Sequence, residues 1–415
     1  ANGRVLTTKD PKGNITTNTY DTKGNLLTTK DAKGNQTHYD YYANGMLKSM
    51  LDAENNITAY TYDAQGNMLT QAQCGATSTY TYDTSGNRIT EKRPQSSVVN
   101  ILTQFNYDAE GRNTKTIYAD NTDTETIYDS LGKAVARADQ KDRETQTDYD
   151  KMGRAYRVTY PDGRTEETTY DNEGHKLSVT ESKAPEIPRT TSYEYDANGR
   201  QTKVTYPDDL FSTTHYDTEG KVDYETDEQG VTTNYSYDAA GRRTGMTRGT
   251  YSVTYGYDAN GNQTSVTDSN GTTYTDYDEL NRPYQVRYPD GSYTTTEYDK
   301  LGRKTAYVDE ENKRTEYTYD CSGKLTSVKD AMNNTTTYGY DLAGNMTTQT
   351  DAEGKITRYT YDNMNRRKTR MLPEGQTEYY NTYDATGNLT SKTNFNGQSL
   401  TYTYNTITDT LMGKV

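Results

Sequence analysis

Polar turn residues and β-branched or aromatic residues alternate along this chain in a fixed rhythm. The stretch Thr315–Asp320 reads Thr-Glu-Tyr-Thr-Tyr-Asp, so its two tyrosines fall on alternate positions. Because successive side chains of a strand point to opposite faces, Tyr317 and Tyr319 share one face. Strand-forming residues bounded by Gly, Asn and Asp predict short antiparallel strands joined by tight turns. We find no helical periodicity, and the sequence predicts an all-β protein.

The phrase Tyr-Asp-x-x-Gly followed by Asn or Arg recurs, often with one or two positions altered, about nineteen times. Its step is usually 21 residues, as from Tyr298 to Tyr319, and ranges from 20 to 25. A period this long indicates a repeat architecture that grows by adding units. We therefore expect residues 1–415 to form a single continuous array of β-hairpin repeats in one long antiparallel sheet. The opening Ala-Asn-Gly-Arg matches the middle of a unit at Ala197–Arg200, so we expect both ends to lie inside a repeat.

Each unit contains two turns of different composition. In the first, Asp precedes Gly by three residues, which suits a type I turn with a G1 bulge, because Asp accepts backbone hydrogen bonds and Gly adopts positive φ. The second turn is looser, and Asn333 replaces Gly in Asp330-Ala-Met-Asn333. We assign the structural repeat motif to Tyr62, Asp63, Gly66, Tyr82, Asp83, Gly86, Tyr195, Asp196, Gly199, Tyr237, Asp238, Gly241, Tyr319, Asp320, Gly323, Tyr361 and Asp362.

The composition restricts how such a sheet can be stabilised. Hydrophobic residues make up 30% of the chain and the mean hydropathy is −1.16, but Tyr contributes 43 residues at regular places. This regularity argues against disorder, and the low apolar content argues against a wide, dry core. We expect a thin sheet with rows of tyrosines, curved into a wall by its twist and bulges around a lumen. The one-residue bulge leaves open whether Tyr and Val share a face.

Several kinds of chemistry are not expected. The net charge of −14 disfavours nucleic acid and anionic membranes as partners, and no apolar run could span a bilayer. Cys74 and Cys321 are too far apart for sequence alone to argue a disulfide framework, a zinc site or a redox pair. His38, His175 and His215 occupy unrelated positions, and His175 replaces the usual Asn or Arg of a turn. The aspartates match no calcium-binding pattern. We expect no catalytic, cofactor or metal site and hence no enzyme.

The repeated motif resembles that of the YD-repeat, or Rhs-repeat, family. This family includes bacterial Rhs and wall-associated polymorphic toxins, the B and C components of Tc toxins, and animal teneurins. The resemblance covers essentially the whole chain and implies a sheet that spirals into a hollow shell. Rhs toxins typically end their repeats in an Asp-Pro-x-Gly-Leu motif linked to self-cleavage. The nearest match, Asp10–Asn14, lies in an ordinary second turn, so we expect neither the protease nor a toxin here.

Two functions are compatible with this resemblance. The first is a structural wall of a secreted Rhs-type protein that encloses or scaffolds another polypeptide, with the rest of its own polypeptide or a secretion partner as the contact. The alternative is a cell-surface adhesin or recognition scaffold whose exposed tyrosines stack on glycans. Both imply a bacterial protein that is secreted or held at the cell surface.

Overall fold

The computed structural model describes residues 3–415, which form 39 strands and no helix. The first strands are β1 (Thr7–Lys9), β2 (Ile15–Tyr20), β3 (Leu26–Lys30), β4 (Gln36–Tyr41), β5 (Leu47–Leu51), β6 (Ile57–Tyr62), β7 (Met68–Gln73), β8 (Ala76–Tyr82), β9 (Arg88–Pro94), β10 (Asn100–Tyr107), β11 (Asn113–Ile117), β12 (Asp123–Tyr128) and β13 (Ala134–Ala138).

The central strands are β14 (Glu144–Tyr149), β15 (Ala155–Thr159), β16 (Thr165–Tyr170), β17 (Lys176–Ser182), β18 (Arg189–Tyr195), β19 (Gln201–Thr205), β20 (Phe211–Tyr216), β21 (Val222–Thr226), β22 (Thr232–Tyr237), β23 (Arg243–Arg248), β24 (Tyr251–Tyr257), β25 (Gln263–Asp268) and β26 (Gly271–Tyr277). The last are β27 (Pro283–Arg287), β28 (Tyr293–Tyr298), β29 (Lys304–Val308), β30 (Arg314–Tyr319), β31 (Leu325–Lys329), β32 (Thr335–Tyr340), β33 (Met346–Thr350), β34 (Ile356–Tyr361), β35 (Arg367–Met371), β36 (Thr377–Tyr383), β37 (Leu389–Thr393), β38 (Ser399–Tyr404) and β39 (Leu411–Lys414).

Consecutive strands pair antiparallel, which confirms the all-β hairpin architecture. At a typical first turn, between β30 and β31, the register shifts between Thr318 and Tyr319, so a bulge lies where the Asp-x-x-Gly turn begins. The expected turn closure is also present, because the Gly323 N–H donates to the Asp320 carbonyl at 3.0 Å and Gly323 has a φ of 84°. The second turn Asp330–Asn334 is built in the same way around Asn333, whose φ is 67°.

The structure decides which residues share a face of the sheet. Tyr317 lies directly opposite Val328, and Thr318 lies opposite Ser327. Tyr and Val therefore share the first face, which we call the tyrosine face. On the other, which we call the threonine face, the hydroxyl oxygens of Thr318 and Ser327 are 2.6 Å apart. Equivalent hydroxyl pairs join Thr19 to Thr28, Thr61 to Thr70, Thr81 to Thr90 and Thr360 to Thr369.

The interior is thin, as the composition predicted. Few apolar side chains are buried, and no large side chain of residues 3–415 is completely buried. The buried apolar residues are Tyr80, Ile101, Ala136, Val253, Ala306 and Tyr359. Stability must therefore come from contacts that recur in every repeat rather than from one central core.

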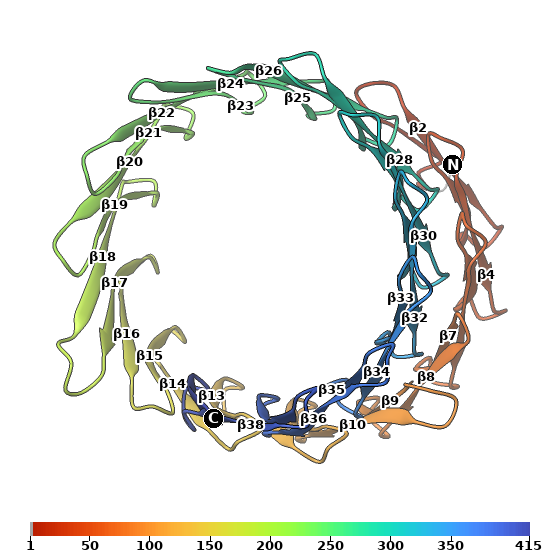
Figure 1. Cartoon of the computed structure of the whole chain (residues 1–415). Helices are drawn as coiled ribbons and strands as arrows, with labels where there is room; N and C mark the ends of the chain where they lie inside the picture. The colour runs from red at the N-terminus through yellow and green to blue at the C-terminus, as the bar shows by residue number, and fades with distance from the viewer. Residues whose placement is uncertain (1–2) are drawn as a thin grey trace. The chain divides into compact units, whose positions relative to one another are not determined.

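Two compact units can be distinguished. Unit 1 comprises residues 3–124, 275–287 and 291–415, and unit 2 comprises residues 125–274 and 288–290. Each unit, taken by itself, is a curved wall one sheet thick (Figure 1). The repeats in the sequence predict that residues 1–415 form a single continuous array, and this stays a prediction.

Within unit 1, turns that are far apart in sequence lie side by side. Second turns of residues 31–120 contact first turns of residues 278–366. The contacting pairs are Lys33–Asp278, Glu54–Lys300, Cys74–Cys321, Gln95–Leu342 and Ala119–Asn363. Their partners are 244 to 247 residues apart, so both segments advance by one repeat from each contact to the next. We call this line of contacts the seam.

The seam includes a pairing that sequence reasoning did not provide. Cys74 and Cys321 form a disulfide, with Cα atoms 5.8 Å apart and 247 residues between them in the chain. Nothing in the spacing of two cysteines in different repeats identifies them as partners. Only the side-by-side position of their two turns brings them together.

Candidate functional site

The residues assigned to the repeat motif lie in separate turns along the edge of the sheet. In the turn that begins at Asp63, the backbone N–H groups of Gln65 and Asn67 donate to Asp63 Oδ1 at 3.0 and 2.8 Å. The Asn67 side chain donates to Oδ2 at 2.9 Å and is the main reason that the pKa of Asp63 lies below its usual value. Gly66 has a φ of 92°. The carboxylate is therefore occupied by its own turn.

The residue after the turn glycine varies, but Asn and Arg make the same side-chain contact at this position. Asn87 Nδ2 donates to Asp83 Oδ2 at 2.9 Å, and Arg200 Nε donates to Asp196 Oδ2 at 2.7 Å. The same contact lowers the pKa of Asp83 and of Asp196. Arginine makes it also at Asp108, Asp150, Asp238, Asp278, Asp299 and Asp362. Asn and Arg alternate at this position because both present an N–H at the required place.

Where this residue is a cation, it also joins one repeat to the next. Arg303 Nη1 donates to the carbonyl of Asp320 in the following turn at 3.1 Å, and its guanidinium lies over the Tyr319 ring, 4.9 Å from the centroid. Equivalent cation–ring pairs are Lys133–Tyr149, Arg154–Tyr170, Arg200–Tyr216, Lys221–Tyr237, Arg242–Tyr257, Arg282–Tyr298, Lys324–Tyr340 and Arg366–Tyr383. Each of these cations therefore lies over the ring of the turn tyrosine in the following repeat.

The hydroxyl of the turn tyrosine has a fixed partner. Tyr319 donates to the backbone carbonyl of Lys304, in the preceding hairpin, at 2.8 Å. Burial raises the pKa of Tyr319. The same bond joins Tyr82 to Met68, Tyr195 to Lys176, Tyr237 to Val222 and Tyr361 to Met346. Tyr62 packs edge-on against Tyr42 with centroids 6.3 Å apart.

Sequence reasoning missed this hydrogen bond, although a signal for it was present. Phe105 replaces the first tyrosine of a Tyr-x-Tyr pair, but in the repeats of this chain the residue before the turn Asp is Tyr. A ring alone satisfies the first position, whereas the second also requires a donor. Gly199 likewise serves two purposes, since it has positive φ and a Cβ added to it would lie 2.6 Å from His175 Nε2 of the preceding turn.

The remaining assigned residues follow the same plan with small variations. Gly86, Gly199 and Gly241 have φ values of 87°, 76° and 81°. Asp320 accepts from the backbone N–H groups of Ser322 and Lys324, both at 2.9 Å. These residues therefore make a row of equivalent turns rather than converging on one cleft, and each carboxylate already has its partners.

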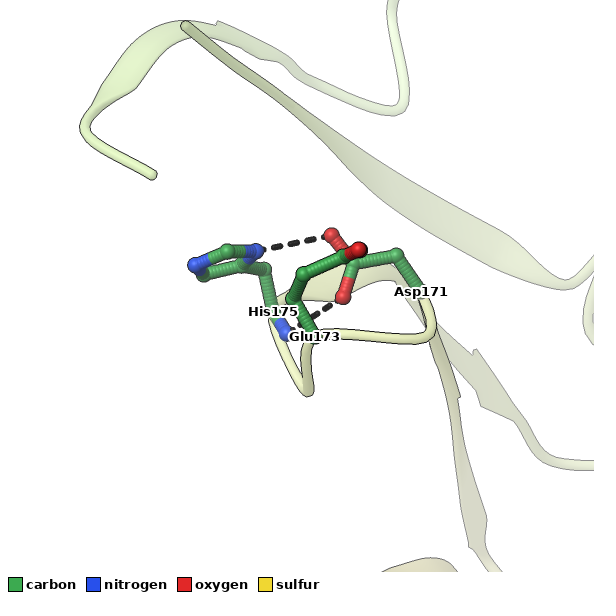
Figure 2. A group of neighbouring side chains, drawn as sticks. All are labelled: Asp171, Glu173 and His175. Carbon is green, nitrogen blue, oxygen red and sulfur yellow. Dashed lines mark hydrogen bonds and ion pairs between the residues drawn. The ribbon is translucent and has the colours of Figure 1, made fainter. Parts of the chain in front are cut away.

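One turn places a histidine beside two carboxylates. The side chains of Asp171, Glu173 and His175 offer ligand atoms within 4.8 Å of one another, as Figure 2 shows. His175 Nδ1 is 2.7 Å from Asp171 Oδ2, which is the position that Asn or Arg occupies in other turns. Burial favours protonation of Asp171, but the hydrogen bonds from the His175 side chain and from the backbone N–H groups of Gly174 and His175 together outweigh it and lower its pKa. The His175 ring also stacks on Tyr195, 4.9 Å away. Asp171, Glu173 and His175 therefore form an ordinary first turn, and a turn position is what the sequence predicted for His175.

Comparison with known families identifies the repeat. A teneurin YD-shell model matches residues 3–160, and an RHS repeat model matches residues 189–209, 216–253, 257–293, 319–356 and 340–377. The chain belongs to the YD-repeat, or Rhs-repeat, family. No curated protein sequence matches it significantly.

Solved structures show the same YD-repeat fold. The crystal structure of TcdB2-TccC3 is similar over 96% of this chain at 15% identity, with a TM-score of 0.60. The Tc holotoxin pore of Photorhabdus luminescens is similar over 95% at 16% identity, with a TM-score of 0.57. The chain spans about a quarter of the length of these neighbours, 25% and 27%. Within residues 3–415, no helix is long and apolar enough to cross a membrane.

Proposed function

We propose that this chain is a wall segment of an Rhs-type shell that encloses or scaffolds another polypeptide. The observation that carries the proposal is a sheet with two solvated faces and no filled core, held by contacts between repeats. A protein built to bind a small ligand needs a cleft with convergent groups, whereas a container needs a stable wall. The likeness to the Tc toxin structures supports this interpretation at the level of the fold.

The wall would act through its geometry rather than through chemistry. Its turn carboxylates and tyrosine hydroxyls are occupied by structural bonds, as in the turns at Asp63 and Tyr319. We therefore propose a non-enzymatic role, with the rest of the same polypeptide or a secretion partner as the contact. Such a role places the protein in the secreted fraction or at the cell surface of a bacterium.

Protease protection of the complete polypeptide that contains this chain tests the proposal. A segment enclosed by the YD repeats is expected to survive a broad-specificity protease under native conditions, and to be degraded after mild denaturation of the wall. The same segment expressed alone serves as the control and is expected to be degraded at once. Equal degradation with and without the wall would contradict enclosure.

A second function, glycan recognition by an adhesin, is favoured by one specific observation. Several tyrosines remain strongly exposed, among them Tyr156, Tyr251, Tyr284 and Tyr293, with 43–49% of their surface accessible. Exposed aromatic faces are suitable platforms for sugar rings. Binding of the purified chain to a glycan array, and its loss on replacing these tyrosines by Ser, would support this alternative.

A further inference from the structure

The contacts along the seam differ in kind. Across it, Lys33 Nζ lies 2.9 Å from Asp278 Oδ2, Lys300 N–H donates to Glu54 Oε1 at 3.0 Å, and the Arg366 guanidinium lies 3.2 Å from Asp120. The Asp278 side chain is 6% exposed, so its bond to Lys33 is little screened, but the Glu54–Lys300 contact is exposed, and exposed polar contacts are weak and are screened by salt. Since the chain has only two cysteines, the Cys74–Cys321 disulfide is the one cysteine cross-link that the seam can have.

The two cysteines lie at the tips of tight turns. Cys74 and Gly75 form a two-residue loop between β7 and β8, in which Gln73 pairs with Ala76 and the φ values are 52° and 79°. Cys321 is the second residue of the first turn between β30 and β31. The disulfide therefore links the ends of two hairpins and lies in the middle of the seam, with two seam contacts on either side.

The disulfide is also within reach of solvent. Cys321 is exposed and Cys74 is half-buried. An open groove of about 610 Å³ runs past both residues and is lined also by Arg93, Ser322 and Lys324. A small thiol can enter a space of this size, whereas a structural disulfide in a packed core is shielded.

We propose that Cys74–Cys321 is a reducible latch that holds the seam of unit 1 shut. A dithiol reductant attacks the Sγ of Cys321, the more exposed of the two residues, forms a mixed disulfide with it and expels the Cys74 thiolate. The second thiol of the reductant then releases Cys321 and leaves as an oxidised, cyclic disulfide. Two electrons pass to the cysteines, which take up two protons and become thiols. The seam then depends only on its hydrogen bonds and ion pairs.

The disulfide makes the stability of the seam depend on the redox conditions around the protein. Oxidising conditions outside a cell favour the disulfide, and the reducing interior of a cell favours the thiols. We infer that unit 1 is fastened after export and loosened on entry into a reducing compartment. This inference does not depend on enclosure of a polypeptide, because it concerns only the contact between two segments of this chain.

Hydrogen exchange followed by mass spectrometry tests the latch on the intact chain, with dithiothreitol as the reductant. Reduction is expected to speed exchange about tenfold or more in the seam turns Asp52–Asn56 and Asp299–Arg303, because local opening is no longer opposed by the cross-link. The turn Asp196–Arg200 of unit 2 is the internal control and is expected to stay unchanged. Alkylation should label both cysteines only after reduction.

The Cys74→Ser/Cys321→Ser variant separates loss of the latch from other effects of the reductant. It is expected to show fast seam exchange with or without dithiothreitol. Seam exchange that is equal in the oxidised, reduced and variant chains would overturn the proposal. Alkylation of the cysteines before reduction, or equal loss of protection in the seam and in Asp196–Arg200, would also overturn it.

Discussion

The turn tyrosine shows how one residue serves several contacts at once. In Tyr319, the ring faces the Arg303 guanidinium, and the hydroxyl donates to the Lys304 carbonyl in the preceding hairpin. A contact of this kind between repeats contributes roughly 0.5–1 kcal/mol from the cation and about 1 kcal/mol from the hydrogen bond. Each is small, but both recur along the array, so their sum determines the stability of a sheet that has no wide core.

Two substitutions of Tyr319 separate the contribution of its ring from that of its hydroxyl. Tyr319→Phe keeps the ring and loses the hydrogen bond, and it is expected to cost about 1 kcal/mol locally. Tyr319→Ala also loses the ring and is expected to cost about 2 to 4 kcal/mol, less than truncation of a fully buried residue. Hydrogen exchange in β29–β31 measures both, with Tyr156→Phe at an exposed site as the control. Equal damage by Phe and Ala would show that the ring itself contributes nothing.

Glycine substitutions separate backbone conformation from close packing. Gly387 has a φ of 92° and a Cβ added there would have no neighbour within 4 Å, whereas a Cβ on Gly199 would lie 2.6 Å from His175 Nε2. Asn tolerates positive φ, and Asn281 and Asn365 already stand at this turn position. Gly387→Asn is therefore expected to be nearly neutral, and Gly199→Asn to lower the local unfolding temperature. Thermal unfolding monitored by hydrogen exchange would detect the difference. Equal effects of the two substitutions would contradict the close packing of His175 against Gly199.

At the scale of elements, the sheet depends on which turns face one another. The tyrosine and threonine faces are decided within each hairpin, but the seam arises from turns that are 244 to 247 residues apart. Asp278 takes part both in its own turn and in the seam. It accepts from Arg282 Nε at 2.8 Å in its own turn and from Lys33 Nζ at 2.9 Å across the seam. Its side chain is 6% exposed, so these bonds are little screened.

This carboxylate makes the seam sensitive to acid. Burial of Asp278 favours its protonation, but hydrogen bonds from Arg282 and Lys33 outweigh this effect and lower its pKa to about 2. Since an unfolded Asp titrates near pH 3.9, the stabilisation is complete above about pH 4 and is lost as the pH falls towards 2. Exchange protection of residues 31–35, corrected for intrinsic rates, is expected to fall in that window. Lys33→Met should remove this protection at every pH, and constant protection from pH 6 to 2 would contradict the assignment.

At the scale of the whole molecule, the low apolar content has a direct consequence. Only 30% of the residues are hydrophobic, and the apolar side chains that are buried are few. A solid rod would need two apolar inner faces pressed together, which these residues cannot supply. A wall with water on both sides needs only the contacts between neighbouring repeats, and this is the arrangement that a container requires.

Small-angle scattering on the purified chain tests the container directly. A hollow wall is expected to give a compact particle whose density is depleted at its centre. Measurement under oxidising conditions keeps the Cys74–Cys321 link, and the Cys74→Ser/Cys321→Ser variant shows how far the result depends on it. A long, thin particle would contradict enclosure and favour the adhesin.

The sequence by itself determined the repeat, its all-β hairpins and the chemistry of each turn. Asp, Gly and the spacing of Tyr-x-Tyr are local signals, and local hydrogen bonds such as those of Asp63 satisfy them. The face shared by Tyr317 and Val328 required the observed bulge, because one extra residue changes the alternation. The partner of the Tyr319 hydroxyl required the preceding hairpin to be in place. The pairing of Cys74 with Cys321, and the seam around it, was decided only by the tertiary structure, because no local signal connects two turns 247 residues apart.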